Sequence, residues 1–406
     1  MKIDSIFFIV AAVVMIILTA LFAFFVLPEL LQQPDRVPPE SSLGYGTDAV
    51  KAEVLDIVEQ DTIELGNVTQ TYQLLRVEIL EGDYQGLEFE VDYGKRQIRP
   101  EGLNLAPGDQ VIVNVGQGAD NVVQVRFLDF VRTTPLLVLF GTFVLFSVLI
   151  SGWKGVRGLL GMGVSIAVII FYIIPQILEG KDPVLVSVSG AFFLLAFSLY
   201  LIYGWALKTH AAVLGTLLSL ILTAFLADYF VDLTRLTGFG SEEALFLLQQ
   251  SGGGINMQGL VLGGMLIGAL GVLDDLVITQ SSVVFELNKL NPDLALFDLY
   301  ARAMRVGQDH VAATVNTLVL AYAGAALPMF LLFSLSGEGL SHLLNLEYVA
   351  EEVVRTMVGS LGLIAAVPLT TLLASLIATH FPTAGPWRRL LGPKTREDSQ
   401  GTPHVH

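Results

Sequence analysis

Long apolar stretches dominate the pattern of hydrophobic and polar positions along the chain. A helix needs about 20 residues to cross a bilayer, and residues 6–27 form one stretch of that length. Seven more follow a polar segment, at residues 135–150, 159–174, 183–203, 211–230, 257–278, 312–335 and 356–379. The pattern predicts a polytopic α-helical membrane protein with about eight transmembrane helices.

The first apolar stretch is longer than the core of about 7 to 15 residues that is typical of a cleavable signal peptide. It ends in FAFFVLPELL, which lacks a small-x-small cleavage site. We therefore expect an uncleaved signal-anchor helix over residues 1–27, with a removed signal peptide as the alternative. Residues 28–47 contain QQPDRVPPE and are expected to form an extended linker.

Short β-rich runs alternate with turn residues between residues 48 and 130. The runs predict strands at residues 51–60, 71–80, 86–93, 109–115 and 121–130. Five short strands in one small domain indicate an all-β, OB-like barrel, with a sandwich as the alternative. Residues 28–132 hold 19 acidic and 8 basic side chains. This charge argues against nucleic-acid binding, so we expect a protein-contact or gating domain.

Two adjacent carboxylates, Asp274 and Asp275, interrupt the apolar stretch that begins at residue 257. Each carboxylate costs at least about 2.5 to 3.5 kcal/mol inside hydrocarbon, so a partner or a task is expected. Residues three and four positions apart lie on the same face of a helix. In this stretch that face carries glycines, which allow close packing, followed by polar groups. The stripe contains Gly264, Gly268, Gly271, Asp275, Thr279, Ser282 and Glu286. The alternative is that the acidic pair is hydrated near the cytoplasmic boundary.

Polar groups also occur in the last two stretches. Asp309, His310, Asn316 and Thr317 would approach the acidic stripe if the two polar helices are antiparallel neighbours, and oxygen ligands suit a proton or a small cation. Packing alone is the alternative for this helix, in which Gly324 is a further predicted packing position. Pro368 lies in the middle of the last stretch, where a helix break can line a binding site or be satisfied by nearby hydroxyls.

The sequence contains few signatures of an enzyme or of a cofactor site. It has no cysteine, which excludes disulfides and cysteine metal centres. Walker, HExxH and GxSxG motifs do not occur. Adjacent acids point about 100° apart on a helix, unlike the facing carboxylates of an aspartyl catalyst. We therefore expect a protein that is not an enzyme and carries no cofactor.

Basic residues are distributed unequally among the predicted loops. Ten lie on one side of the membrane if the amino terminus is cytoplasmic, and only Lys181, Arg235 and Arg355 lie on the other. The positive-inside rule then predicts cytoplasmic termini and an extracytoplasmic β domain. The expected domains are residues 48–130, a seven-helix membrane domain at 133–380 and a disordered cytoplasmic tail at 381–406. Residues 242–250, EEALFLLQQ, are expected to form a short interfacial helix, and residues 294–306 a surface or loop helix.

Nearly the whole chain resembles the YibE/F family of bacterial membrane proteins. The resemblance rests on the order of its parts, on the run GALGVLDDLVITQSSVVFEL, and on GQDHVAATVNTLVLAYAGAALP followed by a proline-containing helix. It implies a bacterial membrane protein but no reaction or substrate. One acid commonly occupies the position of the acidic pair in that family, so the sequence leaves open which of the two matters.

Two functions remain at this point. The first is a permease or channel for a small ion or solute that uses the carboxylates within the membrane. The alternative is a membrane scaffold whose β domain binds a protein of the cell envelope. In both cases the chain is a multi-pass protein of the cell membrane whose surroundings include the lipid bilayer.

Overall fold

The computed structural model describes residues 48–395, except for residues 101, 118–122, 338 and 381–392. The chain divides into two compact units, one ending at Gly152 and the other beginning at Trp153, and each is described by itself. The predicted anchor helix, the linker and most of the tail lie outside the described residues.

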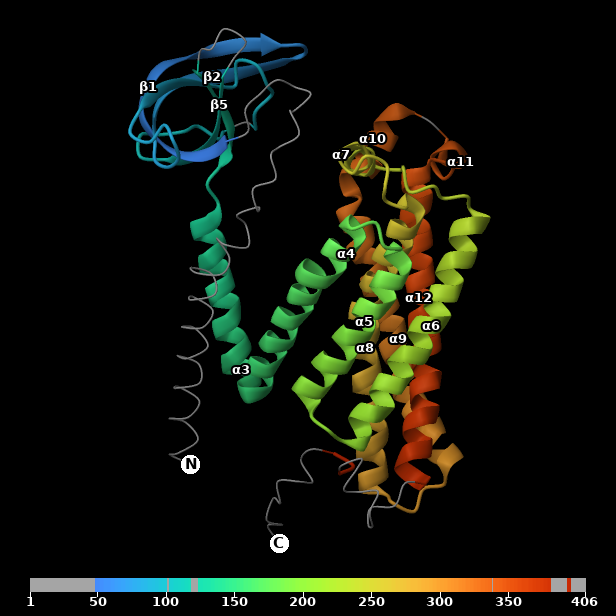
Figure 1. Ribbon diagram of the computed structural model, residues 1–406. Helices are drawn as coiled ribbons and strands as arrows, with labels where there is room; N and C mark the ends of the chain where they lie inside the picture. The colour runs from blue at the N-terminus through green and yellow to red at the C-terminus, as the bar shows by residue number, and fades with distance from the viewer. Residues whose placement is uncertain (1–47, 101, 118–122, 338, 381–392, 396–406) are drawn as a thin grey trace, which may run out of the picture. The chain divides into compact units, whose positions relative to one another are not determined.

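The first unit contains a five-stranded antiparallel sheet in the order β3-β2-β1-β4-β5 (Figure 1). Each predicted strand occurs, and the first two are longer than expected. Alternate residues of β2 are buried, as expected for a strand with one face on a core. The strands are β1 (Asp48–Leu65), β2 (Val68–Ile79), β3 (Glu88–Tyr93), β4 (Gln110–Gln117) and β5 (Val123–Phe130).

The sheet is curled, so its two outermost strands meet. The ring of Tyr93 on β3 lies 4.7 Å from the ring of Phe127 and 5.9 Å from that of Phe130, both on β5. Register shifts in β1 between Val54 and Asp56 mark an irregularity of the kind that bends a strand. Beyond this point β1 pairs only with β2, because its pairing with β4 ends at Glu53. The two strands therefore continue as a two-stranded arm.

The helices largely follow the predicted apolar stretches. They are α3 (Thr133–Val168), the π-helix η2 (Ile169–Ile173), α4 (Ile174–Leu178), α5 (Pro183–Tyr203), α6 (Leu207–Leu233), α7 (Glu242–Gln250), α8 (Met257–Leu290), α9 (Leu296–Ala325), α10 (Leu327–Ser336), α11 (Leu340–Leu343) and α12 (Glu347–His380). The short helix α7 has the predicted bounds.

Five helices of the described chain are long and apolar enough to cross a membrane, or six with a bent pair counted as one. The sequence predicts eight transmembrane helices, and the number found differs from this for two reasons. The stretch at residues 6–27 lies outside the described residues. The stretches at 135–150 and 159–174 belong to one helical run, residues 133–178, which is broken at Gly152. Gly152 has φ 55° and ψ −135°, a conformation open to glycine and rare for other residues.

The bent pair is α9 and α10, which meet at 59°. The sequence predicts one span at residues 312–335, and in the structure this stretch comprises the end of α9 and most of α10, with a bend at Ala326. Pro328 lies in the first turn of α10, where proline is tolerated because that turn needs no amide donor. In addition, α9 begins at Leu296, so residues 296–306 belong to the same helix and do not form a separate one.

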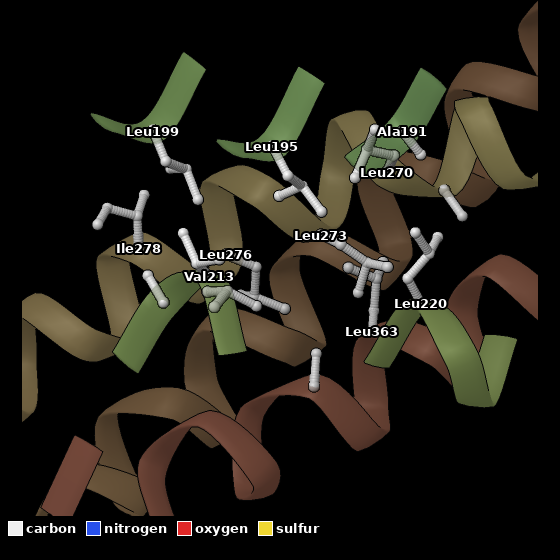
Figure 2. Packing of buried hydrophobic residues seen from close by; sticks show 14 of the residues in the cluster. Ala191, Leu195, Leu199, Val213, Leu220, Leu270, Leu273, Leu276, Ile278 and Leu363 are labelled. Carbon is white, nitrogen blue, oxygen red and sulfur yellow. The ribbon is translucent and has the colours of Figure 1, made fainter. Parts of the chain in front are cut away.

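The core of the second unit lies where α6, α8 and α12 pack together, with α5 beside α8 and α9 against α12 and α8. Figure 2 shows Leu195 and Leu199 of α5 packing towards Leu273 and Leu276 of α8. Small residues permit close approach: a Cβ on Gly362 of α12 would overlap the side chain of Thr223, and one on Gly215 of α6 would overlap Thr370. We call the end where α6 begins and α8 and α12 end the basal end.

Part of the tail has a defined position at the basal end. The backbone oxygen of Pro393 accepts a hydrogen bond from Leu207 N at 2.9 Å, and that of Lys394 accepts one from Lys208 N at 3.2 Å. Thr395 is 4% exposed. Residues 393–395, which belong to the tail that is predicted to be disordered, thus have defined contacts with the helices, whereas the rest of that tail lies outside the described residues.

Candidate functional site

The predicted stripe of α8 occupies a single face of a continuous helix. The side chain of Asn256 caps its first turn by accepting from Gly259 N at 3.0 Å. Six residues of the stripe are exposed and Ser282 is half-buried. The exposed ones are Gly264, Gly268, Gly271, Asp275, Thr279 and Glu286. The helix thus presents glycines and then polar groups along one side that the described core leaves open.

The two adjacent acids face different surroundings. Asp275 is exposed on the stripe, whereas Asp274 is half-buried. The Oδ1 atom of Asp274 is buried and has no hydrogen-bond partner among the described residues. Tyr203, the last residue of α5, lies within electrostatic range of both carboxylates. A buried oxygen without a hydrogen-bond partner is rare and requires an explanation such as a proton, an ion or water. Asp274 has such an oxygen, whereas Asp275 is exposed.

The polar residues of α9 do not bond to the acidic stripe. Asp309, Asn316 and Thr317 are exposed and His310 is half-buried. Thr317 donates its hydroxyl hydrogen to Ala313 O of its own helix at 3.0 Å, as hydroxyls in apolar helices often do. Across the described chain, no hydrogen bond or ion pair joins these residues to the carboxylates of α8.

A buried amide, Gln280, connects α8 to both α9 and α12. Its Nε2 donates to Ala303 O at 3.1 Å and to Thr371 Oγ1 at 2.7 Å, and the residue is 1% exposed. A Cβ at Gly307 would lie 2.9 Å from its amide atoms. Thr371, three residues after Pro368 in α12, therefore serves helix packing. Sequence reasoning missed the role of Gln280, although a glutamine in the middle of an apolar helix was the available signal.

The glycines predicted to pack closely divide into two groups. A Cβ at Gly268 would lie 3.4 Å from Tyr322 Oη, and one at Gly264 would lie 3.8 Å from Arg355 Nη1. At Gly271 and Gly324 a Cβ would meet no atom within 4 Å. Within the described chain no other helix covers the faces of Gly271 and Gly324, so close packing at these two glycines stays a prediction.

The opposite end of the unit contains a charged cluster and an apolar cavity. Arg355 pairs with Glu351 and, at 3.3 Å, with Glu352. A cavity of about 170 Å³ lies between α9, α10 and α12, where Tyr322, Phe330 and Met357 are among its lining residues. No group of three or more metal-ligating side chains occurs in the part of the chain that the structure describes.

Several long apolar helices with polar groups inside them define an α-helical, membrane-embedded protein. The family model of the YibE/F-like proteins matches residues 139–380, and the chain belongs to this family. The family match confirms the resemblance inferred from the sequence. It includes α8 and its acidic pair, α9 and the whole of α12. Neither the curated proteins nor the solved structures contain a match to this chain.

Proposed function

We propose that this protein is a multi-pass permease or channel of the bacterial cell membrane, which conducts a proton or a small cation past the acidic pair of α8. The observation that carries the proposal is the carboxylate of Asp274. Its Oδ1 is buried without a hydrogen-bond partner among the described residues. Uncompensated carboxylates in an apolar helix mark an ion or proton site by default.

The position of the acids along α8 fits a site reached from the basal end. At 1.5 Å per residue, Asp274 lies about 26 Å from the start of the helix, within a hydrocarbon layer of about 30 Å. A short wet passage along Thr279, Ser282 and Glu286 would connect the acids to the basal end. These side chains lie on the open face of α8 and need no rearrangement of the core.

The membrane topology belongs to the same proposal. The helical run broken at Gly152 crosses the membrane twice, and with residues 6–27 this makes eight transmembrane helices. The basal end and both termini are cytoplasmic, because the loops and tail on that side hold most of the basic residues. The β unit is extracytoplasmic and gates the path or recruits a partner. Its strand order, with β3 meeting β5, supports an OB-type barrel.

The test is ion flux into proteoliposomes containing wild-type protein or the double variant Asp274→Asn/Asp275→Asn. The panel consists of protons, sodium, potassium and divalent cations. We expect at least one flux that the double variant reduces to the level of empty liposomes, because Asn keeps the shape of the side chain and removes its charge. Asp298→Asn is the matched control, since Asp298 is an exposed acid in the first turn of α9. Equal flux in all three proteins would refute a role for the pair.

The arm formed by β1 and β2 favours a scaffold as the second candidate. The arm is largely exposed and contains Asp56, Glu59, Asp61 and Glu64, with no basic residue between Lys51 and Arg76. Such a projecting surface suits a basic protein of the envelope. On this alternative, replacing the four acids with amides abolishes capture of one specific envelope protein, and the acidic pair of α8 is dispensable. Neither candidate involves catalysis.

A further inference from the structure

The ammonium group of Lys394 reaches into the basal end of the helical unit. Its Nζ donates to Asn288 Oδ1 at 2.8 Å and to Ala378 O at 2.9 Å. Asn288 is 3% exposed, so its amide oxygen is a buried acceptor that is pointed at a cation. A lysine from the distant end of the chain therefore fills a defined position between α8 and α12.

The helix ends make this position favourable for a positive charge. Ala378 is the third residue from the end of α12 and Asn288 the third from the end of α8. The last four carbonyl groups of a helix lack partners within it, and the carboxyl end carries partial negative charge. The two acceptors are neutral oxygens that can receive the N–H groups of an ammonium ion.

The backbone of residues 393 and 394 makes a second set of contacts, with the first turn of α6. Helix α6 has no side-chain cap at its amino end, where the first amide groups lack helical partners. The oxygens of Pro393 and Lys394 accept from the amides of Leu207 and Lys208. The side chain of Ser281 on α8 donates to Lys208 O at 2.9 Å. Residues 393–395 thus touch all three helices of the core at one end.

We propose that the basal ends of α8 and α12 form a binding site for a primary ammonium group, which the chain fills with its own Lys394. The filled site holds residues 393–395 as a latch across α6, α8 and α12. When the ammonium group leaves, the first turn of α6 loses its acceptors and becomes accessible to water. The site is separate from the acidic pair, and the proposal does not depend on whether ions pass that pair.

The experiment uses the full chain with Lys394→Ala, which removes three methylene groups and the ammonium. n-Propylammonium supplies the missing atoms. Amide hydrogen exchange is followed at Leu207 and Lys208 by mass spectrometry of the peptide that contains them. We expect faster exchange in the variant and a dose-dependent return to wild-type exchange when n-propylammonium is added. n-Propanol, which has nearly the same shape but no charge, is expected to leave the fast exchange unchanged.

Two further variants separate the site from general loosening of the fold. Lys181→Ala removes a lysine whose pairing with Glu179 is exposed and should leave the exchange of α6 unchanged. Asn288→Leu in the Lys394→Ala background removes the buried acceptor and should abolish the effect of n-propylammonium. Unchanged exchange in Lys394→Ala would overturn the proposal. Equal rescue by n-propanol, or rescue that persists without Asn288, would overturn it as well.

Discussion

Substituting Gly307 with Ala tests the contact at which α8, α9 and α12 meet. A Cβ there would lie 2.5 Å from Val367 Cγ1 and 2.9 Å from both Nε2 and Oε1 of Gln280. The amide of Gln280 cannot turn away freely, because it donates to Ala303 O and to Thr371 Oγ1. The added methyl group must therefore displace a helix or break these two hydrogen bonds.

The magnitude follows from opposing effects. Overpacking a filled core costs about 1 to 3 kcal/mol, and each hydrogen bond lost between membrane helices adds about 0.6 kcal/mol on average. Ala is favoured over Gly inside a helix by about 0.8 to 1.0 kcal/mol. Gly324→Ala, next to the last residue of the same helix, has at most this helical gain and no clash, since no atom lies within 4 Å of its added Cβ. The difference between the two variants isolates the contact and should be about 1 to 4 kcal/mol.

The assay is reversible unfolding in detergent, measured by far-ultraviolet circular dichroism for wild type and both variants. Gly307→Ala should lower the free energy of unfolding relative to Gly324→Ala, while Gly324→Ala should equal or exceed wild type. Equal stability of the two alanine variants would show that α9 does not pack at Gly307 as described. The close contact with Gln280 would then be refuted.

Two further predictions concern the β unit and the loop before α7. The hydrogen bond that Tyr72 donates to Glu59 lowers the pKa of Glu59 and raises the pKa of Tyr72 to about 12. The stability that Tyr72→Phe loses should therefore be greatest between the ordinary pKa of Glu59, 4.5, and the ordinary pKa of Tyr72, 10.0. The loss should become smaller as the pH falls through the folded pKa of Glu59 or rises through about 12. A loss in thermal unfolding that does not depend on pH would contradict this. The carboxylate of Glu347 accepts from the amides of Thr237 and Gly238, the latter at 2.8 Å, so Glu347→Ala should cost roughly 1.5 to 3 kcal/mol and accelerate exchange of these two amides, whereas unchanged exchange would refute the contact.

Element boundaries were predictable where local signals define them. Asp182 accepts from Leu185 N at 2.9 Å to cap α5, Pro183 opens the helix, and Gly204 ends it with φ 81°. Each signal depends only on the residue and its immediate neighbours, so the predicted span at residues 183–203 has the bounds of α5. The same holds for α7, which Ser241 caps through Ala244 N.

Contacts between distant segments were not predictable in the same way. Helical spacing grouped the glycines of α8 correctly on one face, but it could not show which helix, if any, covers that face. The glycines that pack most closely, such as Gly215 and Gly362, face hydroxyl residues on helices far away in sequence. The docking of Lys394 on Asn288 and Ala378 also depends on partners that a local pattern does not contain.

The structure distinguishes Asp274 from Asp275, which the sequence alone does not. Adjacent residues on a helix point about 100° apart, so an ion cannot be equally well placed for Asp274 and Asp275. The buried, unpartnered oxygen belongs to Asp274, whereas Asp275 shares the open face with Thr279. If Asp274 holds the ion and Asp275 admits it, Asp274→Asn alone should abolish flux, while Asp275→Asn should reduce it and leave the choice of ion unchanged. The reverse order of severity would place the ion on the open face and make the burial of Asp274 a feature of packing.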